Sequence, residues 1–357
     1  MKKITICITN DYVYDRRIQR CVETLKTHYD IEIICRNLHG ENTDYPDIKV
    51  TRIRMLFNQG FLFYAFFNLR VFLMLLLRKI DIVVAVDYDT IIAAQLSSRF
   101  RGTKLVFDAH EFYEESIEIV HRKNVQKFWK WVGKKFVRKA DSAYTVSGTI
   151  AQTYSEMHGI PFQTVRNVPY FHELSKIRNP HSKKVILYQG VINQGRKLDL
   201  LVDSAKYLPE DYEVWIIGEG DLSQVLREQS GENVVFHSWV HPDELYRLTE
   251  KATLAYNLLD DSSRSYYYSL ANKFFDYIQA GIPSLNNSFP EYVKINERYN
   301  CCIITDVNNA QELAQNIMNL VENKQLLSEK RKNARIAAKD LCWENESKTL
   351  LKIFNSL

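Results

Sequence analysis

The chain contains 357 residues, of which 46% are hydrophobic and 25% are charged. This composition excludes a disordered chain, a fibrous repeat and a small disulfide-rich scaffold, and the length indicates two domains of about 100–200 residues each. The formal net charge of +4 indicates no polyanion partner by itself, but residues 1–165 hold 24 Lys/Arg and 18 Asp/Glu, a balance of +6, which leaves −2 for residues 166–357.

Short apolar runs alternate with amphipathic segments along the first half of the chain. This βαβ alternation predicts a doubly wound parallel sheet. Strands are predicted at 4–9, 31–35, 48–53, 80–86, 104–107, 142–146 and 163–165, and helices at 16–28 and 90–101.

The segment 61–77 is apolar over 17 residues but contains Asn68 and Arg70. Since this is the short limit for a bilayer span, we expect no transmembrane helix. A buried helix of the α/β domain is favoured. The alternative is a helix resting in a bilayer interface, with Arg70, Arg78 and Lys79 at the level of the headgroups.

The segment 121–139 carries eight Lys/Arg and no acid, with aromatic residues at helical spacings. Aromatic and basic side chains together suit an anionic membrane surface, so we expect a docking helix; a solvated basic face over an ordinary core stripe is the alternative. Nucleic acid is disfavoured because no recognition motif accompanies the charge. The residues expected at the membrane surface are Lys127, Trp129, Lys130, Lys134 and Lys135.

A polar stretch at 176–184 reads as a linker, after which the alternation restarts. A second parallel sheet is therefore predicted, in a domain covering 180–340 that follows a first domain covering 1–175, with a last helix at about 341–357 returning to the first domain. Strands are expected at 185–188, 213–217, 234–237, 254–258 and 284–286, and helices at 198–207, 222–229, 242–251, 273–280 and 310–322. Ligands of such sheets bind beyond the carboxyl ends of the strands, so a cleft between the domains is the expected site.

Two glycine-containing turns follow strands of the second domain. Gly190 and Gly195 precede Arg196 at the start of a helix, where backbone N–H groups and a fixed cation favour phosphate. Gly218 and Gly220 form a similar turn after the next strand. Each turn alone is a weak signal, because a tight strand–helix connection has the same composition.

The segment 265–283 is the most informative one. A polar loop with Ser269 and Leu270 enters a helix that contains Lys273 and Asp276. Backbone N–H groups and Lys273 suit a phosphate, and Asp276 suits the hydroxyls of a ribose. A capped helix with an ordinary Lys–Asp pair, of about 0.2–0.5 kcal/mol, is the alternative.

This segment resembles the nucleotide-sugar signature of the family-4 glycosyltransferases, which have the GT-B fold. The run SLANK at 269–273, Asp276-Tyr277 and AGIP at 280–283 carry the likeness. Further matching motifs, in matching order, stand at 87–90, 108–111, 146–147, 167–169 and 188–196. The resemblance implies two Rossmann-like domains and transfer of a sugar from a nucleotide donor with retention of anomeric configuration.

The resemblance also implies roles for single residues. Arg196 and Lys273 would hold the diphosphate, and His110 would contact the donor sugar near the reacting carbon. The remaining donor-binding residues would be Asp276 at the ribose, Ser269, Leu270, Asn272 and Tyr268 near phosphate and sugar, Gly190, Gly218 and Gly220 near the nucleotide, and Val240 near the base. The acceptor side would be bordered by Asn10, Asp11, Asp15 and Arg16.

The sequence departs from the family at three places. Tyr268 stands where the family commonly has a Glu that faces donor-sugar hydroxyls, Val191 stands where an Arg is frequent, and the N-terminal loop lacks the usual paired glycines. The identity of the donor sugar is therefore open, and Arg196 would act more alone.

The resemblance implies a UDP-sugar, or next a GDP-sugar, as donor and a glycan or lipid-linked glycan as acceptor, in cell-surface polysaccharide synthesis. We expect a cytoplasmic enzyme on the inner face of the cytoplasmic membrane, with no cofactor beyond the co-substrate. Asp87-Tyr88-Asp89 spells a D-x-D metal motif, but that pattern is short, and no metal requirement is expected. A GT-B-type sugar-nucleotide epimerase and a non-catalytic sugar-nucleotide-binding protein are the alternatives.

Overall fold

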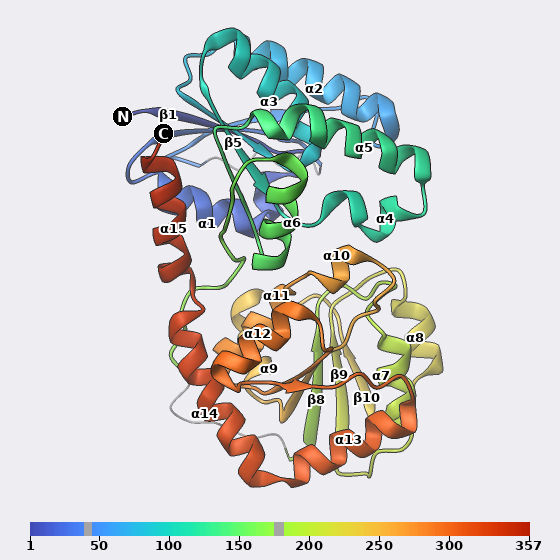
Figure 1. Cartoon of the computed structure of the whole chain (residues 1–357). Coiled ribbons are helices and arrows are strands. Elements are labelled where there is room, and N and C mark those ends of the chain that lie inside the picture. The colour runs from blue at the N-terminus through green and yellow to red at the C-terminus, as the bar shows by residue number, and fades with distance from the viewer. Residues whose placement is uncertain (39–44, 175–181) are drawn as a thin grey trace. The chain divides into compact units, whose positions relative to one another are not determined.

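The computed structural model describes residues 1–38, 45–174 and 182–357. The chain forms two compact units, the first consisting of residues 1–167 and 346–357 and the second of residues 168–345. The first unit thus ends earlier than the predicted position 175 and includes the end of the chain (Figure 1). Most of the predicted linker at 176–184 lies outside the described residues.

The first unit is built on a parallel sheet of seven strands, in the order β3-β2-β1-β4-β5-β6-β7. The strand β4 is buried along its whole length, which explains its continuous β-branched run, because strands in such sheets are covered on both faces. The strands are β1 (Lys3–Cys7), β2 (Asp30–Arg36), β3 (Lys49–Ile53), β4 (Ile82–Val86), β5 (Lys104–Ala109), β6 (Ser142–Thr145) and β7 (Phe162–Thr164).

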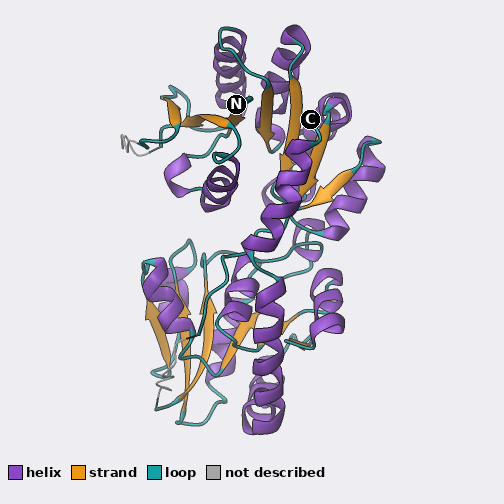
Figure 2. Ribbon diagram, turned by 90° about the vertical axis from the view of Figure 1, so that its left-hand side faces the viewer, coloured by secondary structure: helices purple, strands orange, loops and turns teal. Residues whose placement is uncertain are grey.

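Helices cover both faces of this sheet (Figure 2). α2, α3 and α5 lie on the same face, and α3 packs against both of the others (Figure 1). The helices are α1 (Arg16–Leu25), α2 (Gly60–Leu76), α3 (Tyr88–Arg101), α4 (Ile117–Val120), α5 (Lys123–Phe136) and α6 (Gly148–His158), with short 3-10 turns η1 (Tyr12–Tyr14), η2 (Tyr113–Glu115) and η3 (Val137–Lys139).

The second unit contains a parallel sheet of six strands, in the order β10-β9-β8-β11-β12-β13. Its strands are β8 (Lys184–Gln189), β9 (Tyr212–Ile217), β10 (Val234–His237), β11 (Leu254–Asn257), β12 (Ser284–Asn286) and β13 (Ile303–Ile304). Its helices are α7 (Leu198–Ala205), α8 (Ser223–Gln229), α9 (Pro242–Thr249), α10 (Arg264–Tyr267), α11 (Asn272–Gln279), α12 (Pro290–Tyr299), α13 (Ala310–Glu322), α14 (Lys324–Asp340) and α15 (Trp343–Asn355).

The last part of α15 is bound into the first unit. Arg166 donates to Glu346 from its backbone N and from its guanidinium, at 2.9 and 2.8 Å. Tyr29 donates its hydroxyl proton to Asn355 at 2.8 Å. Leu350, Ile353 and Phe354 are buried, so the final turns of the chain complete the core of the first unit.

Two sheets, each with its first strand in the interior, agree with the predicted doubly wound architecture. The helix α12 and the strand β13 were not predicted. The six cysteines are all buried free thiols. Among the described residues, no helix combines the length and the apolarity needed to cross a membrane.

Candidate active site

In the first unit, polar side chains gather where β4 and β5 end. Asp87 directly follows β4 and adopts a positive φ of 57°, which is strained for a residue with a side chain. Its Oδ1 accepts a hydrogen bond from the backbone N of His110 at 2.8 Å, and its Oδ2 lies 3.8 Å from Nδ1 of the same residue. Its own backbone N donates to Asp108 O at 2.8 Å. The strained turn is therefore fixed from both sides.

His110 stands between two carboxylates. Its Nε2 lies 3.3 Å from Oδ2 of Asp108, whose Oδ1 accepts from the buried Arg17 at 2.5 Å. Burial and Arg17 oppose protonation of His110, but Asp108 and Asp87 outweigh them and raise its pKa to about 9. The imidazole is thus cationic at neutral pH, and its side chain keeps 21% of its surface exposed.

Arg17 was not predicted as a functional residue; its neighbour Arg16 was, and Arg16 is exposed. The signal was present in the sequence, because Arg17 shares the core-facing stripe of α1 with Ile18, Cys21 and Val22. A cation on such a stripe needs a buried partner. The partner is Asp108, and Arg17 and His110 together lower the pKa of that carboxyl although burial opposes its ionisation.

Asp89 lies beside this group at the start of α3. Its Oδ2 accepts the hydroxyl proton of Thr9, whereas its buried Oδ1 has no hydrogen-bond partner among the residues that the structure describes. Burial, and then repulsion from Asp87, raise the pKa of Asp89 to about 7. Asp87 and Asp89 are therefore both engaged by groups of the protein, and the described residues contain no cluster of three His, Cys, Asp or Glu side chains suited to a metal ion.

Of the predicted acceptor-side residues, two are exposed and two serve as caps in local structure. Asp11 is fully buried, accepts from the backbone N of Val13 and Leu38, and so stabilises a turn instead of facing a ligand. Asp15 caps α1 through the backbone N of Ile18, at 3.0 Å. Asn10 and Arg16 are exposed at the carboxyl end of β1. Because a carboxylate caps η1 and another caps α1, the sequence DYVYD at 11–15 is explained by local structure.

In the second unit, glycines bring the first two strand–helix turns into contact. Gly218 has φ 137°, and a Cβ at this position would overlap the carbonyl oxygen of Gly190. A Cβ at Gly220 would meet Ile192 O and Asn193 Oδ1 at 2.5 Å. The side chain of Lys273 lies over Gly190, where an added Cβ would be 3.4 Å from its Cε. The glycines therefore let the backbone close around Lys273.

Lys273 is buried at the start of α11. Its Nζ lies 3.8 Å from the centre of the Tyr188 ring and has no hydrogen-bond partner within residues 1–38, 45–174 and 182–357. Burial and the nearby Arg196 lower its pKa well below the usual value, although Asp276 opposes this. Arg196 lies 5.5 Å from the Tyr266 ring, and its buried Nε is also unpartnered. Two basic side chains thus each have a buried nitrogen without a hydrogen-bond partner among the described residues, which is costly unless a ligand supplies one.

Asp276 is held by a chain of hydrogen bonds from neighbouring elements. Its Oδ2 accepts from Gln189 Nε2 at 3.2 Å, and Gln189 Oε1 accepts from the Thr249 hydroxyl at 2.7 Å. The backbone N of Gln189 donates to Tyr277 OH at 3.1 Å. This arrangement fixes the carboxylate beside Lys273 at the end of β8.

The predicted phosphate loop is only partly available. The backbone N and the hydroxyl of Ser269 both donate to Tyr266 O, at 3.1 and 2.8 Å. Ser269 therefore terminates α10 and does not offer its N–H to a phosphate. Leu270 is buried, and the exposed Asn272 opens α11. Tyr268 is half-buried, with its ring 5.5 Å from that of Tyr267.

Comparison with protein families decides the class of the protein. The model of glycosyltransferase family 4 matches residues 15–175, and the model of glycosyl transferases group 1 matches residues 183–323. The chain belongs to the glycosyltransferases, with a family 4 domain followed by a group 1 domain. The search of curated proteins found no match.

Solved structures show the fold that this glycosyltransferase shares. Sucrose-phosphate synthase from Thermosynechococcus elongatus has a TM-score of 0.79 at 12% identity, covering 100% of this chain and 99% of that one. HepE from Anabaena, in complex with UDP, has a TM-score of 0.77 at 14% identity over 100% of both chains. WaaG, involved in lipopolysaccharide biosynthesis, has a TM-score of 0.75 at 15% identity, covering 98% and 99%. The predicted GT-B fold is confirmed.

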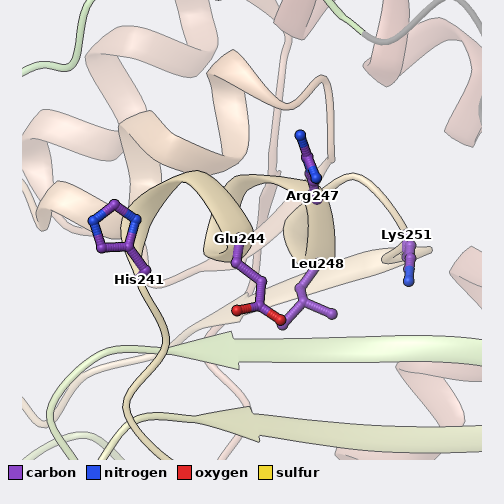
Figure 3. Close-up of a pocket in the computed structure, with 5 residues that line it drawn as sticks. All are labelled: His241, Glu244, Arg247, Leu248 and Lys251. Carbon is purple, nitrogen blue, oxygen red and sulfur yellow. The ribbon is translucent and has the colours of Figure 1, made fainter.

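Val240 of the glycosyltransferase is half-buried and packs against the core of the second unit beside Leu245 and Tyr246. A cavity of about 480 Å³ follows it along α9, and Figure 3 shows the side chains that line it. These are His241, Glu244, Arg247, Leu248 and Lys251. None of them belongs to the group around Lys273 and Arg196, so the cavity is separate from these two basic side chains.

The predicted membrane-facing residues of the glycosyltransferase include one error. Trp129 is only 4% exposed, because its ring packs edge-on against Tyr64 and Tyr113. The exposed aromatic residues of α5 are Phe128 and Trp131. Lys127, Lys130, Lys134 and Lys135 are exposed as expected, although Lys130 pairs with Glu115 at 2.8 Å.

Proposed function

We propose that this glycosyltransferase transfers a sugar from a UDP-sugar to a glycan or lipid-linked glycan with retention of anomeric configuration. The donor half of the proposal is carried by one observation: Lys273 and Arg196, near Asp276, each have a buried nitrogen without a hydrogen-bond partner among the described residues. A nucleoside diphosphate supplies the missing negative charge, and its ribose hydroxyls suit the fixed carboxylate. HepE, a protein of the same fold, has been captured with UDP-glucose, which supports uridine as the base.

The proposed chemistry depends on charge. As the glycosidic bond to the diphosphate breaks, the leaving group gains negative charge and the sugar becomes oxocarbenium-like. Lys273 and Arg196 stabilise the departing diphosphate, and removing one such group typically costs about 3–4 kcal/mol of barrier. Retention then follows from same-face attack, with a leaving phosphate oxygen accepting the proton of the acceptor hydroxyl.

The first unit would supply His110. A cationic imidazole cannot act as a base, so its proposed role is to donate hydrogen bonds and to oppose negative charge on the donor. Asp89, with its unpartnered Oδ1 and a pKa of about 7, is suited to accept a hydrogen bond from the acceptor hydroxyl. We assign no covalent nucleophile.

The proposed setting is the inner face of the cytoplasmic membrane, in synthesis of a surface polysaccharide. Two proteins of the same fold, WaaG and the galactosyltransferase WaaB, belong to lipopolysaccharide synthesis by their names. The exposed lysines of α5 suit an anionic membrane. Metal independence is also proposed, since His110 contacts both carboxylate oxygens of Asp87 and Thr9 binds one of the two oxygens of Asp89. Activity that is lost in chelator and restored by Mn²⁺ would contradict it.

The test is a transfer assay combined with a thermal-shift panel of UDP-, GDP- and ADP-sugars. We expect the UDP-sugars to raise the melting temperature most. R196A and D276A should abolish turnover with the fold intact, whereas V225A, at an exposed position of α8, should match the wild type. Near-native activity of both site variants would contradict the assignment. Conversion of donor without acceptor would favour an epimerase, and binding without release of nucleotide would favour a binding protein.

A further inference from the structure

α2 has an unusual distribution of apolar side chains. Its inner seam packs into the first unit and consists of Phe63, Phe67, Val71 and Leu75. Its outer seam is equally apolar and is exposed at intervals of three or four residues, so that it forms one stripe along the helix. The members of this outer stripe are Leu62, Phe66, Leu69, Leu73 and Leu77, which are 45–88% exposed.

Neighbouring segments extend the outer stripe at both ends. Leu56 and Phe57 precede the helix and are exposed, and the Phe57 ring lies 5.5 Å from that of Phe66. Near the other end, the 72% exposed Phe100 of α3 packs edge-on against Phe72 at 6.1 Å. A continuous apolar surface of this kind marks an interaction site rather than scattered exposed residues.

The charges around the outer stripe are almost all positive. α2, α3 and α5 together contain eight Lys/Arg and a single acid, Asp89. One carboxylate oxygen of that acid accepts the hydroxyl proton of Thr9. Lys127, Lys134 and Lys135 of α5 form no ion pair within the described parts of the chain. The rings of Tyr64 and Trp129, 5.2 Å apart, bring α2 and α5 into contact, and both helices lie on the same face of the sheet (Figure 1).

We propose that α2 lies flat in the interface of an anionic membrane and provides the apolar part of the contact, while the lysines of α5 bind the headgroups. This inference rests on the proposed membrane location and names the surface responsible for it. Apolar side chains next to Lys/Arg are the combination that such interfaces bind. A second copy of the chain is a poorer occupant, because pairing of two such surfaces would bring cations against cations.

The experiment is cosedimentation with vesicles of phosphatidylcholine containing 30% phosphatidylglycerol (~0.1 M salt). The apolar variant is L62Q/L69Q/L73Q, and its matched control is Y207Q/V225Q/I336Q, which changes similarly exposed residues of the second unit. The charge variant is K127Q/K134Q/K135Q. At about 1 kcal/mol, or fivefold, per cation near the surface, the charge variant should bind about 100-fold more weakly. Since each of the three leucines is about half exposed, the apolar variant should lose about as much membrane affinity as the charge variant. The control should bind like the wild type.

Two further measurements test whether the variants still bind the donor and whether α2 itself contacts the lipid. UDP-induced thermal shifts should be the same for wild type and all variants, because none of these residues lies near Lys273. An L69C variant labelled with an environment-sensitive dye should shift to the blue on vesicles, and labelling is selective because the native cysteines are buried.

The possible results separate the inference from the proposed function. If the wild type binds the vesicles and the apolar variant binds equally well, α2 is not the contact surface, and the membrane location stands. If the wild type does not bind, the membrane location and the role of α2 are both wrong, while donor binding is untouched. If the wild type sediments as a dimer without lipid and the apolar variant as a monomer, a second copy covers the stripe and the inference is overturned.

Discussion

Asp87 contacts His110 through both of its carboxylate oxygens, one at the backbone N at 2.8 Å and the other at Nδ1 at 3.8 Å. One side chain thus fixes the position of the histidine backbone and, together with Asp108, stabilises the charged form of its ring. The strained backbone of Asp87 persists because these contacts hold it.

D87N should lower the pKa of His110 from about 9 towards its usual value, because the substitution removes a negative charge while keeping an oxygen for the backbone contact. NMR titration of the imidazole measures the change. We expect turnover to fall about 10–100-fold with little change in UDP affinity. D203N, at an exposed carboxylate paired with Lys206, is the control and should alter neither quantity.

The ionisation of His110 should make stability depend on pH. Because its pKa is raised from 6.5 to about 9, the stabilisation is fully present below pH 6.5 and is lost as the pH rises through about 9. The free energy of unfolding of the wild type should therefore fall relative to H110Q by about 2–3 kcal/mol over this window. Urea unfolding of both proteins at pH 6, 7.5 and 9 measures it. A constant difference would show that folding does not raise the pKa of His110.

Lys273 should take up a proton when a nucleoside diphosphate binds. Burial and Arg196 lower its pKa in the free protein, and an added anion raises it again. Calorimetry at pH 8 in buffers of different ionisation enthalpy should show a net uptake of protons when UDP binds. K273R keeps its charge at this pH and should bind UDP without uptake. Equal uptake by both proteins would exclude Lys273 as its source.

We expect Thr249 to affect donor binding by orienting Gln189 and not by contacting the donor. T249V removes the hydroxyl that orients Gln189 and thereby Asp276. We expect the KM for the donor to rise about threefold to tenfold, in line with a lost hydrogen bond of about 1 kcal/mol, with kcat nearly unchanged. A drop in kcat at constant KM would contradict this role. T253V is the comparison: it removes a hydroxyl just before β11 that accepts from the backbone N of Val185 at 3.2 Å, and it should leave the KM for the donor nearly unchanged.

Gly218 should tolerate no side chain. In G218A the new Cβ overlaps the carbonyl oxygen of Gly190 at a positive φ, so the two turns must separate. We expect a loss of stability of about 2 kcal/mol or more and weaker UDP binding, measured by urea unfolding and calorimetry. In G231A the nearest atom is an Asn233 side-chain oxygen at an ordinary 3.4 Å, so this variant should be nearly neutral.

The regular elements could be predicted because buried parallel strands produce continuous apolar runs, as in β4 and β8. Lys273 and Asp276 could be predicted as neighbours because both stand on one helix. The partners that fix them could not: Gln189 and Thr249 reach Asp276 across long separations in sequence. Asp11 was assigned to the acceptor side although it caps a local turn. In the sequence, a ligand-binding loop and a capped turn both appear as a short polar motif after a strand.

Trp129 shows a related limit of prediction from the sequence. The pattern of α5 located the aromatic residues, but which tryptophan faces outward depends on Tyr64 and Tyr113, which come from two other segments. The exposed apolar stripe of α2 was likewise ambiguous, because a helix that is apolar all round reads as a core helix.

The return of residues 346–357 to the first unit makes the second unit an insertion within the first. Two covalent connections, after Asn167 and before Glu346, therefore join them. Removing the final residues would strip Leu350, Ile353 and Phe354 from the core of the first unit, so a C-terminal truncation damages the N-terminal half of the protein. The first 167 residues therefore lack part of their own core, which is complete only when residues 346–357 have joined it.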